Sequence, residues 1–215
     1  MTGRMLVIDC ATPALSIALF DGAHCIAARH EELGRGHAEA LLPAIAALPE
    51  GGRCDSILVD VGPGSFTGVR VGLAAATALG FAWGVPVLGY GCLDLVAAMA
   101  RARLAPQERF AIVMVGGHGE LFWAMSDPAS DAPLEVRSTP IAELAETIDA
   151  PLLVGSGASV LIEAGARGNP VPLLPDARDA LLLPESLRAR PAKPVYGRGA
   201  DAKPMPAARV RAPSR

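Results

Sequence analysis

A glycine-rich segment, VDVGPGSFTGVRVG at residues 59–72, carries the strongest local signal for chemistry in the sequence. Gly62 and Gly64 let the backbone turn sharply after a strand, and Ser65 or Thr67 can cap the first turn of the helix that follows. The amino terminus of such a helix can hold an anion. The segment is not a Walker loop, because no Lys-Ser or Lys-Thr follows its glycines. The alternative is a structural turn that only lets strand and helix pack closely.

A second group of polar residues lies at the end of the first predicted strand. Asp9 ends that strand and Thr12 follows in the turn, where a phosphate-binding hairpin would place an acid and a hydroxyl. An acid in this position can equally be a turn former or a helix cap. Arg70, one turn into the helix, could pair with a phosphate or with a carboxylate. The candidate nucleotide or anion site therefore consists of Asp9, Thr12, Gly62, Gly64, Ser65, Thr67 and Arg70.

The other chemistry-bearing side chains form no site in the sequence. The histidines and cysteines are His24, His30, His37, His118, Cys10, Cys25, Cys54 and Cys92. They contain no CxxC pair and no two ligands at metal-binding spacing, and no serine among the glycines has an evident base. We therefore expect no metal site, no disulfide framework and no catalytic residues. His37 is interpreted as the start of a helix.

The elements that must position these residues alternate between strands and helices. The first half of the chain begins with an antiparallel meander of three strands and continues with strand and helix in turn, which indicates a parallel component. Strands are expected at 5–9, 15–20, 24–30, 56–61 and 86–90, and helices at 37–48, 67–83 and 93–102.

A cluster of prolines and charges near residues 104–109 marks the boundary to a second lobe. That lobe again begins with two strands, at 110–115 and 120–125, and then alternates between helix and strand. Both halves thus start with a hairpin, which indicates an internal duplication. The expected organisation is an N-terminal lobe at 1–105, a smaller lobe at 106–198 and a basic Pro/Arg-rich tail at 199–215. We expect partial disorder from residue 184 onward rather than an RNA-binding arm.

Composition limits the class of protein. Of the 215 residues, 51% are hydrophobic and 19% charged, which is typical of a folded globular chain. The formal net charge of -3 provides no overall basic field for nucleic acid. The uncharged run between Arg70 and Asp94 is long enough for a membrane helix, but glycines and Pro86 interrupt it. We expect a buried helix and strand there, no membrane span, and a cytoplasmic protein.

The sequence resembles the TsaB (YeaZ) family along nearly its whole length. The segments LVIDCATPALSIALF, RGHAEALLPAI, VDVGPGSFTGVRVGLAAATALGFAWGVPVLG and PVYGR occur in the order of that family. Among them, GPGSFTGVRVG is the most specific match. The resemblance implies an α/β fold of the actin, sugar kinase and heat-shock chaperone (ASKHA) type, with two ribonuclease H-like lobes whose mixed sheets are flanked by helices.

The resemblance also implies a function. The chain would be a non-catalytic scaffold subunit that its paralogue TsaD requires to transfer threonylcarbamoyl to the adenosine beside the anticodon of tRNA. The implied partners are TsaD and TsaE homologues, a second copy when the chain is alone, and tRNA only through the complex. No tightly bound cofactor is implied, although an adenine nucleotide could bind weakly at the complex interface. The implied partner interface is a helical bundle through His37, Leu41, Ile45, Val71, Ala74, Ala75 and Ala78.

Two departures from family patterns bear on the chemistry. The catalytic paralogue has a metal-binding His-x-x-x-His, and alignment through PVLGY places Cys92 and Val96 at those positions. Valine cannot ligate a metal, so we expect no metal-dependent transfer by this chain. Gly116 and its neighbours replace an Asp-Ala-Arg motif. The alternatives are a small ASKHA-type ATP-dependent phosphotransferase or ATPase acting alone, a peptidase and a membrane protein.

Overall fold

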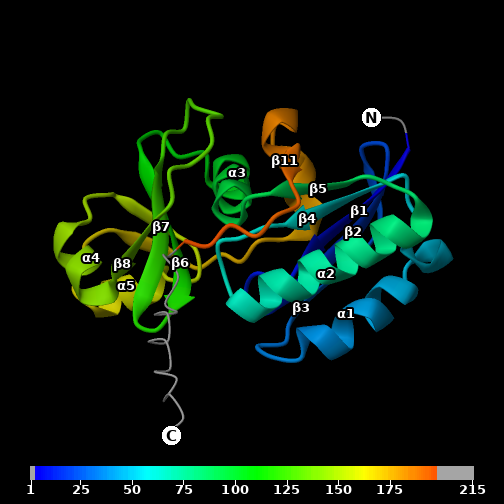
Figure 1. The fold of residues 1–215 in the computed structure, drawn as a ribbon. Coiled ribbons are helices and arrows are strands. Elements are labelled where there is room, and N and C mark those ends of the chain that lie inside the picture. The colour runs from blue at the N-terminus through cyan, green and yellow to red at the C-terminus, as the bar shows by residue number, and fades with distance from the viewer. Residues whose placement is uncertain (1–2, 198–215) are drawn as a thin grey trace, which may run out of the picture.

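The computed structural model describes residues 3–197, in which the chain forms two lobes, each built on its own sheet (Figure 1). The first sheet has the order β11-β5-β4-β1-β2-β3. In this sheet β1, β2 and β3 pair antiparallel, whereas β4 lies parallel to β1 and β5 lies parallel to β4. The strands are β1 (Arg4–Asp9), β2 (Ala14–Asp21), β3 (His24–Glu32), β4 (Ser56–Asp60), β5 (Val87–Tyr90) and β11 (Arg190–Pro191).

The second sheet repeats this arrangement with the order β10-β9-β6-β7-β8. Here β6, β7 and β8 pair antiparallel, β9 lies parallel to β6, and β10 parallel to β9. Three antiparallel strands followed by two parallel ones in both lobes confirm the internal duplication that the two hairpin starts predict. The strands are β6 (Phe110–Gly117), β7 (Glu120–Ser126), β8 (Arg137–Pro140), β9 (Leu152–Val154) and β10 (Asn169–Val171).

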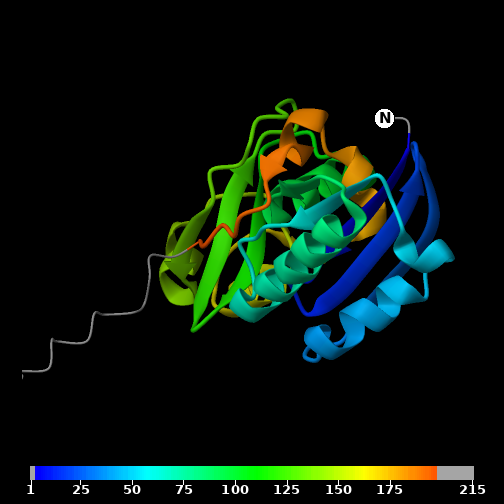
Figure 2. The same ribbon diagram turned by 45° about the vertical axis from the view of Figure 1, so that its right-hand side comes forward.

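Helices flank both sheets. The α-helices are α1 (His37–Ala46), α2 (Phe66–Trp83), α3 (Cys92–Leu104), α4 (Ile141–Thr147) and α5 (Ala158–Glu163), and the 3-10 helices are η1 (Pro49–Gly52), η2 (Ala177–Leu182) and η3 (Glu185–Arg188). In Figure 2, α1 and α2 lie together on one side of the first sheet. The predicted positions of α1, α2 and α3 are confirmed to within a few residues, and Pro43 lies inside α1.

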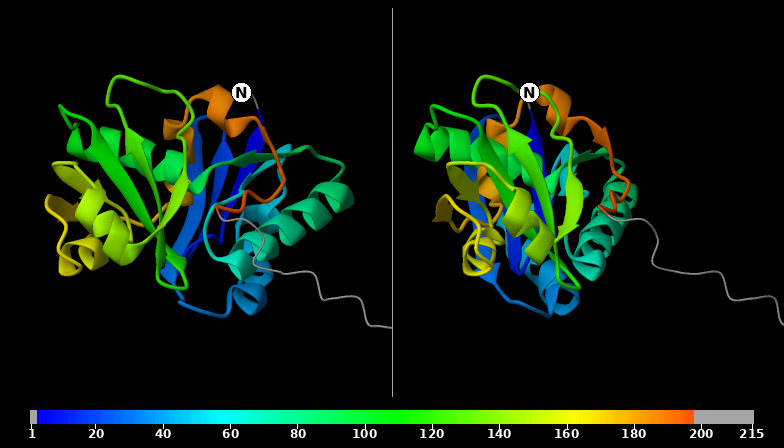
Figure 3. Two further views of the ribbon diagram at one scale, coloured as in Figure 1. Left: turned by 60° about the vertical axis from the view of Figure 1, so that its left-hand side comes forward. Right: turned by 90° about the vertical axis from the view of Figure 1, so that its left-hand side faces the viewer.

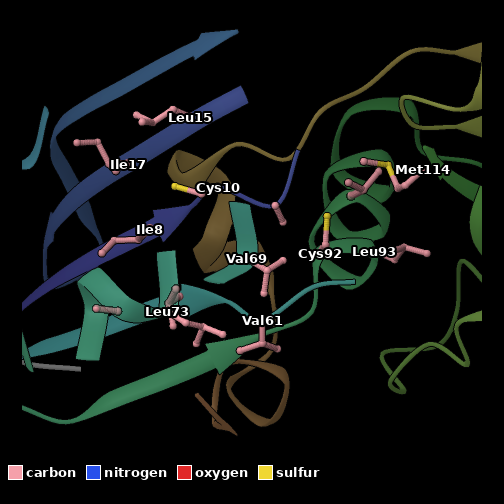
Figure 4. Packing of buried hydrophobic residues seen from close by; sticks show 14 of the residues in the cluster. Ile8, Cys10, Leu15, Ile17, Val61, Val69, Leu73, Cys92, Leu93 and Met114 are labelled. Atoms are coloured by element: carbon pink, nitrogen blue, oxygen red, sulfur yellow. The ribbon is translucent and has the colours of Figure 1, made fainter. Parts of the chain in front are cut away.

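The alternation of β1 explains how the sheet packs on both faces. Leu6 and Ile8 belong to the hydrophobic cluster that contains α1 and α2, whereas Met5 and Val7 belong to the cluster formed with α3 and η2. The larger cluster continues into the second lobe, where Met114 of β6 joins it (Figure 4). Because one core runs through both lobes, they pack as a continuous hydrophobic unit.

The end of the described chain returns to the first lobe (Figure 3). The sequence assigns η2, η3 and β11 to the second-lobe range 106–198, yet η2 packs in the first-lobe cluster and β11 pairs with β5. The expectation of disorder from residue 184 is wrong for η3 and β11, since Arg190 of β11 forms an ion pair with Asp94 at 2.7 Å. The predicted tail at 199–215 lies outside the described residues.

Helix α2 has the length and apolar composition of a membrane span, and it is the one such helix in residues 3–197. Its residues divide into two faces. Gly68, Val69, Gly72, Leu73, Ala76 and Gly80 are buried against the sheet. The opposite face is exposed, and it is defined here as the α2 outer face: Phe66, Arg70, Ala74, Thr77, Ala78 and Phe81.

Candidate functional site

The glycine loop between β4 and α2 packs directly on the turn between β1 and β2. Ser65 N–H donates to the Ala11 carbonyl at 2.7 Å. A Cβ at Gly64 would overlap the Ala11 carbonyl, and a Cβ at Gly68 would overlap the carbonyl of Cys10. These contacts require glycine, so the loop serves the close packing of strand turn and helix, which was the structural alternative at the sequence level.

The same packing leaves the amino terminus of α2 open. The Ser65 hydroxyl accepts a hydrogen bond from Gly68 N–H at 3.2 Å and so caps one orphan donor. The N–H groups of Phe66 and Thr67 have no hydrogen-bond partner in the described part of the chain. Both residues are exposed, and the first turn of α2 contains no acidic side chain. Two backbone donors and the positive end of an 18-residue helix therefore face solvent.

Asp9 and Asp60 lie buried beneath the glycine loop, at 0% and 1% exposure. Asp9 accepts hydrogen bonds from the Tyr90 hydroxyl at 2.8 Å and from Ala11 N–H at 3.1 Å, so both its oxygens have donors. Asp60 accepts from Gly62 N–H at 2.6 Å through Oδ1, while its Oδ2 has no partner within residues 3–197. Donors thus favour the charged form of Asp9, and Asp60 is the natural holder of a proton.

Electrostatics agrees with that assignment. Burial and the charge of Asp9 raise the pKa of Asp60 well above its usual value. Burial also raises the pKa of Asp9, although hydrogen bonds from its neighbours oppose the shift. Burial and the two carboxyl groups raise the pKa of the Cys92 thiol, which favours its neutral form. Asp9, Asp60 and Cys92 thus form a buried polar cluster beneath the glycine loop.

A cleft of about 720 Å³ lies beside this core and is lined by both lobes. Thr12, Gly64, Ser65 and Thr67 of the predicted anion site line it. So do residues whose role was missed from sequence, namely His37 and Glu39 of α1, Arg35, Ser156 and the β6–β7 turn around Gly116. No sequence spacing could show this, because the α1 and α2 termini converge only through tertiary packing.

Three predicted site residues do not reach the cleft lining. Asp9 and Gly62 lie underneath the loop, and Arg70 points to the α2 outer face. There the Arg70 guanidinium stacks on the Phe66 ring at 3.6 Å and donates to the Tyr196 hydroxyl at 3.0 Å. Thr12 uses its hydroxyl to accept from Ala14 N–H at 3.2 Å. The nucleotide or anion role of the whole set remains a prediction.

A second cleft of about 480 Å³ contains His30 and Asp176. The buried Ser16 hydroxyl lies 3.1 Å from His30 Nδ1, and Asp176 Oδ2 lies 3.8 Å from the same nitrogen. In a hydrolytic triad the serine and the acid contact opposite ring nitrogens. Because both groups here approach Nδ1, the cluster does not have a nucleophile–base–acid arrangement. Burial alone would raise the pKa of Asp176, but hydrogen bonds from Arg178 lower it below the usual value.

The predicted metal and interface residues can be placed directly. Cys92 and Val96 are both 0% exposed, and residues 3–197 contain no group of three His, Cys, Asp or Glu side chains placed to hold a metal. Leu41 and Ile45, predicted for the partner interface, are buried in the core of this chain and are not available to a partner. The predicted interface residues that are open are Ala74 and Ala78, which are exposed, and Val71 and Ala75, which are half-buried; His37 is 9% exposed.

The repeated strand order, the cleft between the lobes and the helices on both faces define an α/β protein of the ASKHA fold class, with two ribonuclease H-like lobes. Residues 28–137 match the sequence profile of the family described as TsaD, tRNA N6-adenosine threonylcarbamoyltransferase. YeaZ from Pseudomonas aeruginosa has a similar structure, with a TM-score of 0.73 and 28% identity over 91% of this chain and 100% of that one. The chain belongs to this family, in its TsaB (YeaZ) branch.

Curated relatives support the same branch. The Escherichia coli tRNA threonylcarbamoyladenosine biosynthesis protein TsaB is 33% identical over 129 residues, which cover 56% of this chain and 54% of that protein. An uncharacterised Mycobacterium leprae protein is 34% identical over 148 residues, 61% of this chain and 40% of the relative. The chain thus matches about half the length of these curated relatives or less.

Proposed function

We propose that this chain is a non-catalytic subunit in the biosynthesis of threonylcarbamoyl-adenosine in tRNA, acting in the cytoplasm. In this role it supports a TsaD-type transferase by binding it, with a TsaE homologue as a further partner, and it meets tRNA only through the complex. The names of its relatives supply the pathway. The observation that carries the binding role is the α2 outer face.

The α2 outer face has the properties of a helix-packing surface. Phe81 is 91% exposed and Phe66 57%, which is unusual for large apolar side chains of a monomer. Between them, Ala74 and Ala78 are small and exposed, so another helix can approach closely. Leu42 of α1, 52% exposed, adds apolar surface on the neighbouring helix. A partner helix would remove these side chains from water, which stabilises association by roughly 25 cal/mol per Å² of apolar surface.

A supporting role also fits the chemistry of the interior. The acids that could assist phosphoryl or acyl transfer, Asp9 and Asp60, are buried and hydrogen-bonded within the chain. The Cys92 thiol is held in its neutral form by burial. Activity in this proposal therefore resides in the partner, and the free chain would be a dimer of two copies through the same helices.

Reconstitution of the modification tests this proposal. Purified TsaD and TsaE homologues, the adenylate-forming enzyme, tRNA, threonine, bicarbonate and ATP are combined with and without this chain, and the modified nucleoside is quantified by mass spectrometry. We expect product only when the chain is present. Product formation that is indifferent to the chain would overturn the proposal.

A matched pair of variants separates the interface from general stability. Ala78→Arg places a long charged side chain in the centre of the α2 outer face, and we expect it to abolish both product and co-elution with the TsaD homologue. Ala102→Arg makes the same change at an exposed position of α3 and should leave both intact. Equal loss in the two variants, or normal product with Ala78→Arg, would contradict the assignment of the α2 outer face.

A further inference from the structure

We infer that Ser16, His30 and Asp176 form a proton-controlled latch, which holds the chain that crosses between the lobes more firmly when the His30 ring is charged. The crossing chain, residues 172–176, joins β10 of the second lobe to η2, which packs on the first lobe. The inference does not depend on the proposed role of the α2 outer face, because the latch lies in the second cleft, against α3 and the crossing chain.

The latch is assembled from three parts of the chain. Ser16 of β2 and His30 of β3 lie directly opposite each other in the antiparallel pair. Asp176 immediately precedes η2, and the next residue, Ala177, donates its N–H to Ser16 Oγ at 2.8 Å. Ser16 is 1% exposed and Asp176 5%, whereas the His30 side chain is 25% exposed and lines the cleft. Protons from solvent therefore reach the imidazole, while its two partners are held in the interior.

When the ring is neutral, the hydrogen bond runs from serine to histidine. The Ser16 hydroxyl has one proton and two acceptors within reach, His30 Nδ1 at 3.1 Å and Asp176 Oδ1 at 3.5 Å. The shorter distance favours Nδ1, so the ring carries its own proton on Nε2. The Asp176 carboxylate then receives its hydrogen bonds from the Arg178 backbone and guanidinium.

One proton added to the ring reverses this hydrogen bond. The charged ring has an N–H on both nitrogens, so Nδ1 must donate and Ser16 Oγ becomes its acceptor. The serine proton turns to Asp176 Oδ1, and the imidazolium charge faces Asp176 Oδ2 at 3.8 Å. No covalent bond changes except the N–H bond that forms with the solvent proton. The charged state thus adds a hydrogen bond and an ion pair between the sheet and the crossing chain.

The other charges around the ring leave Asp176 as its close acidic partner. Arg178 binds Asp176, and Arg103 of α3 is paired with Asp179, so both basic groups at the cleft have acidic partners of their own. Burial opposes ionisation of Asp176, but hydrogen bonds from Arg178 hold its pKa below the usual value. The carboxylate is therefore charged throughout the range in which histidines titrate. The charged and titratable groups that face the ring or act on it are Asp9 of β1, Glu32 of β3, Arg103, Asp176 and Arg178.

Hydrogen exchange of the full chain, followed by NMR, tests the latch. The readout is the protection of the Ala177 and Arg178 amides, whose acceptors are Ser16 Oγ and Asp176 Oδ1, between about pH 5 and 8. Protection is expressed relative to the amides of β6, which removes the effect of pH on global stability. We expect the relative protection to fall by about two- to fivefold as the pH rises, the size of a partly exposed ion pair. Constant relative protection would overturn the inference.

Matched variants locate the effect. Glutamine is polar but does not titrate, so His30→Gln should abolish the pH dependence. His24→Gln makes the same change at an exposed position of the same strand and should retain it. Asp176→Asn keeps an acceptor for Arg178 N–H but removes the charge that the imidazolium meets, so it should also abolish the pH dependence. A pH dependence that persists in His30→Gln or in Asp176→Asn, or that disappears in His24→Gln, would refute the latch.

The imidazole of the unsubstituted chain gives a second readout that does not require any variant to fold. Nitrogen chemical shifts of the ring report which nitrogen carries the proton. At high pH we expect the neutral His30 ring to be protonated on Nε2, with Nδ1 accepting from the Ser16 hydroxyl. A neutral ring protonated on Nδ1 would show that the serine proton is directed elsewhere, and the proposed reversal would then be wrong.

Discussion

At the scale of single residues, the most informative pair is Asp9 and Asp60. Both are buried, but their hydrogen bonds differ: Asp9 has donors on both oxygens, whereas within residues 3–197 Asp60 accepts from Gly62 N–H at Oδ1 and its Oδ2 has no hydrogen-bond partner. Two carboxylates this deep cannot both be charged without a large desolvation cost. A proton in the pair is therefore favoured on Asp60, whose pKa is raised well above its usual value by burial and by the charge of Asp9.

That proton makes stability depend on pH. Burial and the charge of Asp9 raise the pKa of Asp60 above its value in the unfolded chain, about 3.9. The folded state thus binds a proton that the unfolded state has released. The stability that this proton contributes is fully present below about pH 4, roughly the pKa of Asp60 in the unfolded chain. It is lost as the pH rises through the raised pKa of Asp60 in the folded state.

Asp60→Asn tests this effect. Asparagine keeps an acceptor for Gly62 N–H and remains neutral, so it resembles the protonated acid at every pH. We expect the variant to match the parent near the unfolded pKa and to become more stable than the parent as the pH rises. Urea unfolding from acid to neutral pH measures the difference. Asp149→Asn, at an exposed position, controls for net charge, and a pH-independent difference for Asp60→Asn would contradict the shared proton.

At the scale of elements, the decisive contact is between α2 and the turn that follows β1. The two approach so closely that a Cβ at Gly68 would overlap the Cys10 carbonyl, an atom that cannot move without moving β1. One turn further along α2, a Cβ at Gly72 would lie 3.6 Å from the Cβ of Cys10 and from Val59, which is ordinary contact. The packing therefore requires glycine at position 68 but has room for a Cβ at position 72.

Gly68→Ala and Gly72→Ala should consequently have opposite effects. We expect Gly68→Ala to cost about 3 kcal/mol or more, because the helix must shift off the strand turn. Gly72→Ala should stabilise by roughly 0.5–1 kcal/mol, because alanine loses less backbone entropy in a helix. The free energy of unfolding in urea, with the helix content checked by circular dichroism, measures both. Similar losses in the two variants would show that the strand–helix contact is not what requires Gly68.

The same contact shows what sequence could and could not predict. Long periodic elements such as β2 and α2 were found at nearly their observed limits, because their hydrophobic patterns span many residues. The short strands β8, β10 and β11 were not predicted, because two to four residues are too few to show a hydrophobic periodicity. At the site, the glycine loop was found from its composition, whereas the approach of His37 to the same cleft depends on tertiary packing.

At the scale of the whole molecule, the chain after β10, up to residue 197, contacts both lobes and connects them. It crosses from β10 to the first sheet, where Arg190 pairs with Asp94 of α3 at 2.7 Å. Asp94, 3% exposed, also accepts a hydrogen bond from Leu134 N–H of the second lobe at 2.9 Å. The segment then runs over the glycine loop, where Val195 N–H donates a hydrogen bond to the Val61 carbonyl at 2.7 Å. One buried carboxylate thus joins α3, the second lobe and the returning chain.

Arg190→Ala should weaken the contact between the returning chain and Asp94. It removes the ion-pair partner of the buried Asp94 carboxylate, and since the arginine is partly exposed we expect a loss of about 2–3 kcal/mol. Burial already raises the pKa of Asp94, with Arg190 among the groups that oppose the shift, so the variant should lose more stability at neutral than at acid pH. Hydrogen exchange should speed up in residues 185–197 and at the Leu134 amide. As a control, Arg137→Ala removes an exposed ion pair with Glu135. This variant should change neither the stability nor the hydrogen exchange of these amides. If exchange rises only in residues 185–197 while Leu134 stays protected, the carboxylate holds the returning chain but does not join it to the second lobe.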